Sequence, residues 1–188
     1  MRVLGIDPGL TRCGWGVVDG VPGQRPTPVG VGVVRSSPDL ALEVRLLQLH
    51  SEITVLLRTH RPDVVAVERV FTQNNKGTAT GTAQAAGVAA LAAAQASLSV
   101  AWHTPSEVKA AISGSGRADK DQVTMMVTRV LGLASPPKPA DAADALALAV
   151  CHAWRGPAQR RLEVAALAGG IGAPVVQRTL PRWQGVSR

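Results

Sequence analysis

The sequence predicts an α/β fold in which helices flank a mixed five-stranded sheet. Three short apolar runs come first, rich in β-branched residues and separated by Gly, Pro and Asp, which is typical of an antiparallel meander. They cover residues 2–7, 13–19 and 29–35. After a stretch of helical periodicity, the near-continuous apolar run 63–68 has the pattern of a strand covered on both faces of a parallel sheet. A meander followed by a crossover helix and a further strand predicts a mixed sheet.

The remaining elements follow from periodicity and from helix-end signals. Apolar residues recur at helical spacing from Leu42 to Leu57, Asp39 is expected to cap this helix, and Pro62 ends it. A long segment of Ala, Gly and Thr predicts the next helix, and Asp119 is expected to cap a later one. The expected elements after the fourth strand are a helix at 77–97, a strand at 98–102 and helices near 105–112, 119–131 and 140–153.

Composition restricts the class of protein. The chain has 188 residues, of which 46% are hydrophobic, enough for one domain with a substantial core. Its two cysteines do not form a disulfide framework, and we find no secretory signal. The longest stretch of low charge, residues 85–102, is too weakly apolar for a membrane span. We therefore expect a cytoplasmic protein.

Positive charge is concentrated at the carboxyl end. The net charge is +7, and residues 155–188 contribute +5 of it through six arginines and a single acid, Glu163. Residues 1–154 contribute only +2, although they hold most of the charged groups. This pattern favours a nucleic-acid partner and predicts a domain at 1–154 followed by a basic, mobile tail at 155–188.

Four acids occupy positions where a lone carboxylate would be costly. Asp7 and Glu68 each end an apolar strand run, and parallel neighbouring strands would bring both to the carboxyl edge of the sheet. Asp141 and Asp144 are three residues apart at the start of an apolar helix, so they share one of its faces. A cluster of oxygen ligands without Cys suits Mg²⁺ or Mn²⁺, and two such ions can promote phosphodiester displacement.

Each of the four acids also has a simpler interpretation. Asp7 would be a turn residue before Pro8, and Glu68 would pair with a nearby arginine. Asp141 would cap its helix, while Asp144 would interact with the helix dipole. Four acids in strand-end and helix-start positions favour the metal-binding interpretation over four separate structural roles.

Five sequence blocks together resemble one family. They are "GIDPGLTRCGWGVV", "AVERVF", "AAGVAALAAA", "VKAAISGSGRADKDQV" and "DAADALALAVCH", and they extend from about Met1 to His152. In order and spacing they are similar to the RuvC family of Holliday-junction resolvases. The resemblance implies an RNase H-like fold and a homodimeric, Mg²⁺-dependent endonuclease. Such an enzyme makes paired symmetric nicks in four-way junctions during recombination and DNA repair, with a RuvAB-type branch-migration complex as its partner.

The resemblance also implies roles for individual residues. Asp7, Glu68, Asp141 and Asp144 match the catalytic carboxylates that hold two metal ions, with Asp7 bridging the ions. Lys109 and Lys120 match lysines that contact phosphate. Phe71, the only phenylalanine, would stack on an unpaired base at the crossover. Lys109 as a solvated helix residue and Phe71 as a core residue are the alternatives.

Some features depart from the family or leave the interpretation open. Ala86 stands where the family usually has Arg, so a contact to DNA or to a helix would be lost. The tail past residue 155 is longer than the family core requires. Small residues in 77–97 would permit close contact between two subunits, or would pack on the chain's own sheet. These small residues are Gly81, Ala85, Gly87 and Ala89–Ala90.

Two other functions compete with the nuclease. One is a junction-binding module with an inert site. The other is a phosphate-loop protein of the actin-like or sugar-kinase type, because "DPGLT" also fits its phosphate loop. Such proteins need a second domain with its own loop, for which this chain is too short.

Overall fold

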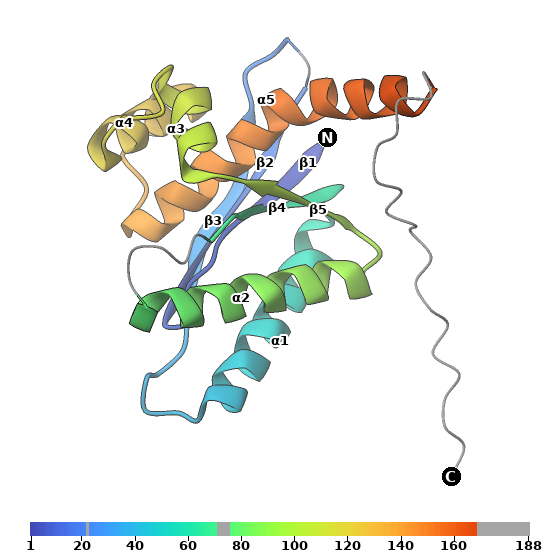
Figure 1. Cartoon of the computed structure of the whole chain (residues 1–188). Helices are drawn as coiled ribbons and strands as arrows, with labels where there is room; N and C mark the ends of the chain where they lie inside the picture. Colours follow the sequence, from blue (N-terminus) through green and yellow to red (C-terminus); the bar gives the residue numbers. More distant parts are fainter. Residues whose placement is uncertain (22, 71–75, 169–188) are drawn as a thin grey trace. The chain divides into compact units, whose positions relative to one another are not determined.

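The sheet has five strands in the order β3-β2-β1-β4-β5, which confirms the predicted class (Figure 1). The computed structural model describes residues 1–21, 23–70 and 76–168. Its strands are β1 (Arg2–Asp7), β2 (Arg12–Asp19), β3 (Thr27–Arg35), β4 (Val64–Glu68) and β5 (Ser99–His103). Its helices are α1 (Leu42–His60), α2 (Lys76–Gln95), α3 (Pro105–Ser113), α4 (Lys120–Leu131) and α5 (Ala140–Ala168). Strands β1, β2 and β3 form the antiparallel meander, while β1, β4 and β5 run parallel.

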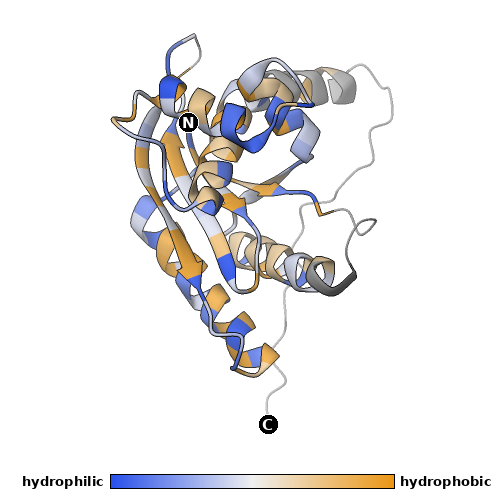
Figure 2. Cartoon of the chain, turned by 90° about the vertical axis from the view of Figure 1, so that its left-hand side faces the viewer, coloured by the Kyte–Doolittle hydropathy of each residue, from blue (hydrophilic) through white to orange (hydrophobic). Residues whose placement is uncertain are grey.

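Helices cover both faces of the sheet. Side chains alternate across β1, so that Leu4 and Ile6 pack with α1 and α2, whereas Val3 packs with α3, α4 and α5. The central strands are buried on both faces, which explains their continuous apolar sequences. Figure 2 shows hydrophobic and hydrophilic residues interspersed along α1, whose buried residues Leu49, Ile53 and Leu57 recur every fourth position and therefore share one face.

The helix caps agree with the prediction at one place and differ at another. Asp119 accepts a hydrogen bond from the Gln122 backbone N–H at 2.8 Å, so the predicted cap of α4 is confirmed. The prediction that Asp39 caps α1 is wrong, because α1 begins at Leu42 and its cap position is Ala41. Asp39 instead lies in a turn, where its N–H donates to the Ser37 hydroxyl at 3.2 Å.

The last helix is longer than predicted. The sequence pattern predicts an end near residue 153, but α5 continues to Ala168 and includes the first part of the region expected to be an irregular tail. Gly156 and Pro157 are outweighed by the run of strong helix formers that follows them. The chain forms two units, Met1–Gly156 and Pro157–Arg188, each of which has its tertiary contacts mainly within itself. Residues 169–188 lie outside the described part of the chain.

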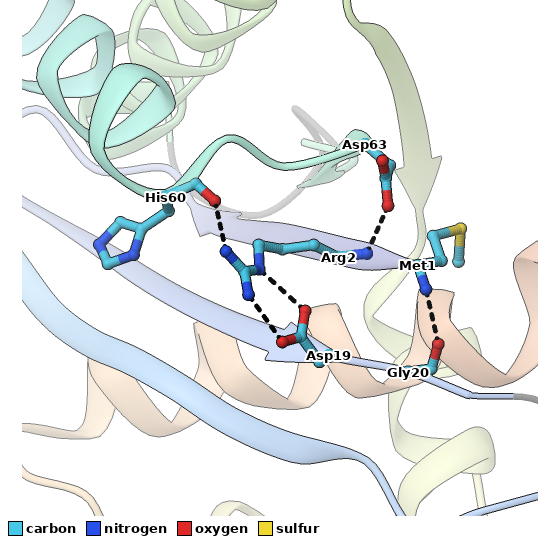
Figure 3. A network of polar contacts seen from close by, with 6 residues as sticks. All are labelled: Met1, Arg2, Asp19, Gly20, His60 and Asp63. Carbon is cyan, nitrogen blue, oxygen red and sulfur yellow. Dashed lines mark hydrogen bonds and ion pairs between the residues drawn. The ribbon is translucent and has the colours of Figure 1, made fainter.

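Paired charges and reciprocal hydrogen bonds hold the amino end of β1 (Figure 3). The Arg2 guanidinium donates to both oxygens of Asp19 at 2.8 Å, and to the His60 carbonyl at 3.0 Å. The Arg2 backbone N–H donates to the Asp63 carboxylate at 2.6 Å, while the Asp63 N–H donates to the Arg2 carbonyl at 2.8 Å. This end of the strand is therefore fixed to β2 and to the α1–β4 connection.

None of the helices in the described residues combines the length and the apolarity needed to cross a membrane.

Candidate active site

Asp7 and Glu68 lie at the same edge of the sheet. Asp7 is the last residue of β1 and Glu68 the last residue of β4, and the two strands are parallel neighbours in which Ile6 pairs with Val67. Both residues are only partly buried. The expectation that strand direction brings the two acids together is confirmed. In Figure 1 the amino ends of α2 and α5 lie at this same side of the sheet.

Helix α5 reaches this edge because a glycine lies beneath its first turn. Gly14 pairs with Asp7 in the β1–β2 ladder. A Cβ atom at position 14 would lie 2.0 Å from the carbonyl oxygen of Asp141, a distance that no side chain tolerates. The absence of a side chain therefore lets the backbone of α5 rest on β2 beside Asp7. This contact was not among the sequence predictions, although a glycine within an apolar strand run is its visible signal.

Asp141 and Asp144 lie inside the first turns of α5. The helix begins at Ala140, so Asp141 is not the cap residue that the simpler interpretation proposed. Side chains of both aspartates are about four-fifths buried, with 20% of Asp141 and 24% of Asp144 exposed. The four acids thus come from two strand ends and one helix start that are far apart in the sequence.

The four carboxylates influence one another electrostatically. Burial, followed by the negative charges of Glu68, Asp144 and Asp141, raises the pKa of Asp7 to about 8. The pKa of Glu68 is also raised, first by burial and then by Asp144. The pKa values therefore identify a site where negative charge is concentrated and poorly solvated.

The two lysines that the sequence pointed to, Lys109 and Lys120, lie close enough to the acids for their charges to interact. The Lys120 ammonium lies 3.2 Å from an Asp144 oxygen and donates a hydrogen bond to it, while three-quarters of the lysine side chain remains exposed. The Asp144 charge and this hydrogen bond raise the pKa of Lys120. Lys109 on α3 is close enough for its charge to lower the pKa of Glu68, although burial and Asp144 outweigh it.

Sequence reasoning missed two arginines at the site. Arg12 Nε lies 3.1 Å from Asp141 Oδ2, and Arg45 on α1 donates to the Thr11 hydroxyl at 2.8 Å. Both arginines line a cavity of about 500 Å³ together with Asp7, Asp141 and the β1–β2 turn. A hairpin that returns directly after Asp7 necessarily brings Arg12 back to the same end of the sheet, and this is the signal that was available.

The donor set fits a hard divalent cation. Carboxylate oxygens are the ligands that Mg²⁺ and Mn²⁺ prefer, and the raised pKa of Asp7 shows that a cation would be favoured at this position. Within the described residues, no three His, Cys, Asp or Glu side chains are already arranged around one ion position. Asp141 faces Arg12 and Asp144 faces Lys120, so a divalent cation would have to compete with these bases.

Comparison with known proteins assigns the chain to a family. The family model for the crossover junction endodeoxyribonuclease RuvC matches residues 3–152. The chain belongs to the RuvC family. A RuvC from Saccharopolyspora erythraea is 67% identical over 162 residues, which cover 86% of this chain and 81% of the relative. A RuvC from Salinispora arenicola is 63% identical over 166 residues, covering 88% of this chain and 95% of the relative.

A solved RuvC structure has the same fold. T. thermophilus RuvC in complex with a Holliday junction substrate superposes with a TM-score of 0.80 at 37% sequence identity, over 85% of this chain and 96% of that chain. The expected RNase H-like fold and the resemblance drawn from five sequence blocks are both confirmed. Ala86, which stands where the RuvC family usually has Arg, lies on α2 and is buried in the core with 4% of its surface exposed. Phe71 lies outside the described residues.

Proposed function

We propose that this chain makes paired symmetric nicks in Holliday junctions by hydrolysing phosphodiester bonds with divalent cations, during homologous recombination and DNA repair. The observation that carries the proposal is the convergence of four carboxylates and two lysines at one edge of an RNase H-like sheet. Family membership supports the substrate, since relatives along nearly the whole chain are crossover junction endodeoxyribonucleases.

The carboxylates and the lysines have different tasks in this proposal. Asp7, Glu68, Asp141 and Asp144 would hold the cations, because the charges of the other three acids all act on Asp7 at the end of β1. When bound, two Mg²⁺ or Mn²⁺ ions would supply the chemistry of metal-assisted hydrolysis, namely an activated water and a polarised scissile phosphate. Lys120, mostly exposed beside Asp144, would contact the phosphate backbone as a point charge, and Lys109 would do so from α3. Phe71 would stack on an unpaired base.

A homodimer would provide the two matched cuts, and α2 offers a surface for it. Ala85 and Ala89 are fully buried against the chain's own sheet. On the opposite side of the helix Ala83, Gly87 and Leu91 are exposed at four-residue spacing, and the space around Gly87 is open. The two small residues of this row would permit close approach of two copies about a two-fold axis, and the exposed Leu91 would supply an apolar contact. Sedimentation equilibrium tests it: wild type is expected to be a dimer and Gly87→Arg a monomer, whereas a dimeric variant would contradict this interface.

The remaining proposals concern the setting of the enzyme. A RuvAB-type branch-migration complex would bring junctions to it, and the cytoplasm is the expected compartment. The two cysteines support a reducing compartment, because Cys13 and Cys151 are both buried free thiols. Burial raises the pKa of Cys13 to about 12 and that of Cys151 to about 11, so both stay protonated.

Nicking of a four-way junction beside a linear duplex of the same sequence tests the function. Wild-type protein is expected to nick the junction in Mg²⁺ or Mn²⁺, but neither substrate in EDTA. Asp7→Asn should abolish nicking and keep junction binding. Asp19→Asn is the matched control, because it removes a carboxylate from the other end of the β1–β2 pair and should nick normally.

Junction binding without nicking in either metal would leave the inert binding module as the function. ATP binding would favour the phosphate-loop protein.

A further inference from the structure

Arg12 is paired with Asp141 in an unusual way. Its Nε lies 3.1 Å from Asp141 Oδ2, yet this buried oxygen accepts no hydrogen bond of acceptable geometry from the described residues. The arginine side chain is 53% exposed, whereas that of Asp141 is 20% exposed. The contact is therefore a charge pair between a buried acceptor and a cation that reaches in from the cavity. A carboxylate oxygen in this state retains its capacity to bind a stronger cation.

Arg45 lines the same cavity and differs from Arg12 in that hydrogen bonds hold its guanidinium in place. It donates to the Thr11 hydroxyl at 2.8 Å and to the Ser36 hydroxyl at 3.1 Å, and Ser36 in turn donates to the Leu10 carbonyl at 2.6 Å. These bonds tie α1 to the β1–β2 turn and to the residue after β3. No comparable bond of the Arg12 guanidinium is found in the described residues besides its pair with Asp141. Arg45 is thus structural, while Arg12 is free to exchange its partner.

We propose that Arg12 is a replaceable counter-ion, which neutralises Asp141 in the metal-free protein and is displaced from it when a divalent cation binds. The proposal rests on the function proposed above, since it requires the acids to bind a metal. Position makes the exchange possible: Arg12 begins β2 directly after the turn that follows Asp7, and the close seat of α5 on Gly14 brings Asp141 within its reach. Without this cation, the Asp141 charge would lose its ion-pair partner while it acts on the neighbouring charge of Asp7.

The exchange has a measurable consequence for metal affinity. A cation that must displace Arg12 binds more weakly than one that meets an unpaired Asp141, because the ion pair has to be broken first. Exposed and partly exposed ion pairs contribute up to about 1 kcal/mol, which corresponds to about fivefold in a dissociation constant. Removing the guanidinium should therefore tighten metal binding about fivefold, provided that Asp141 is present.

Mn²⁺ binding to the full chain without DNA, followed by electron paramagnetic resonance of the free ion, tests the proposal. Arg12→Gln is expected to bind Mn²⁺ about fivefold more tightly than wild type. Arg12→Lys keeps the charge and should bind nearly as wild type does. Arg45→Gln is the matched control at the same cavity, with an expected change below about twofold. In the Asp141→Asn background, Arg12→Gln should have no effect, because the partner is already absent.

The outcomes separate this proposal from the proposed function. Unchanged or weaker Mn²⁺ binding by Arg12→Gln overturns the counter-ion role, even if the wild-type protein binds Mn²⁺ and nicks junctions. An equal gain in the Asp141→Asn background also overturns it, because the effect would then arise from the general field of the arginine. A wild-type protein that neither binds Mn²⁺ nor nicks junctions would refute the proposed function, and the counter-ion role with it.

Discussion

The two ends of β1 treat charge in opposite ways. At the amino end the Arg2 guanidinium is paired with the Asp19 carboxylate and donates to the His60 carbonyl, while the Arg2 backbone N–H donates to the Asp63 carboxylate (Figure 3). At the carboxyl end Asp7 is surrounded by three further acids, and its pKa is raised to about 8. The charges at the Arg2 end of β1 are therefore neutralised and stabilise the fold. At the Asp7 end, negative charges lie close together although they repel one another.

The difference shows where stability and function separate in this fold. Pairing lowers the pKa of Asp19 and raises that of Arg2, so both are more stable in their charged forms when folded. Asp7 and Glu68 are shifted the other way, which means that folding works against their ionised forms. A cation bound at this edge of the sheet would offset the unfavourable free energy of the ionised acids.

The largest expected effect comes from separating α5 from the acidic end. Gly14→Ala would place a methyl group 2.0 Å from the Asp141 carbonyl, so the helix start must move away from Asp7. We expect nicking to fall by about 100-fold or more, since a displacement of about 1 Å is enough for this. Overpacking should also lower the free energy of unfolding by about 1–3 kcal/mol. Nicking assays and urea unfolding measure the two effects.

Gly81→Ala is the control for that variant. It adds the same methyl group near the same cavity, but there it meets the Leu10 side chain at an ordinary 3.5 Å. Because alanine is favoured over glycine within a helix, stability should be kept or should rise by about 0.5–1 kcal/mol. A Gly14→Ala variant that is as stable and as active as Gly81→Ala would contradict the seat of α5 on β2.

A smaller effect is expected from the cations that face the acids. Lys120→Gln removes the ammonium that pairs with Asp144 at 3.2 Å, and nicking should fall by about 100-fold if this charge stabilises the transition state. Lys109→Gln should have a weaker effect, because Lys109 is the smallest of the named influences on the pKa of Glu68. Single-turnover nicking rates at saturating protein compare the two. Equal rates for Lys120→Gln and wild type would remove Lys120 from the site.

The smallest effect is expected at the neutral end of the strand. Asp19→Asn removes an exposed ion pair, so the Tm at pH 7 should fall by only about 1–3 °C. The pKa of Asp19 is lowered, chiefly by the hydrogen bond from Arg2, so its stabilisation is present above the unfolded pKa of about 3.9. It is lost as the pH falls through the lower folded value, where the two proteins should melt together. A difference that grows on acidification would contradict this assignment.

Sequence patterns located those parts of the site that depend on strand direction and local capping. Asp7 and Glu68 could be placed together because both end apolar strand runs, and Asp119 because its side chain and Gln122 form a local capping box. Asp39 could not be placed correctly, since Ser37 offers a competing local hydrogen bond. The pair of Arg12 with Asp141 depends on how closely α5 approaches β2, which becomes visible only when the strands and helices are assembled.

The end of α5 illustrates a second limit of sequence reasoning. Gly156 followed by Pro157 is a normal signal for a helix end, yet α5 continues through them to Ala168. Helix propensity acts over many residues, so a favourable run on the far side can outweigh two unfavourable ones. The same reasoning placed the start of α5 correctly, because the acids of its first turns and the apolar residues after them act together.

The pH dependence of folding stability, with and without a divalent cation, tests the contrast between the two ends most directly. The free energy of unfolding is measured from pH 5 to 8 for wild type and Asp7→Asn, in EDTA and in saturating Mn²⁺. At each pH the value for Asp7→Asn is subtracted from that for wild type, which removes the contribution of the other titrating groups. Since the folded pKa of Asp7 is about 8 and its unfolded value about 3.9, wild type in EDTA should lose stability relative to Asp7→Asn as the pH rises. Mn²⁺ should reverse this loss, and most strongly at pH 8. A flat difference in EDTA that Mn²⁺ leaves unchanged would contradict the account.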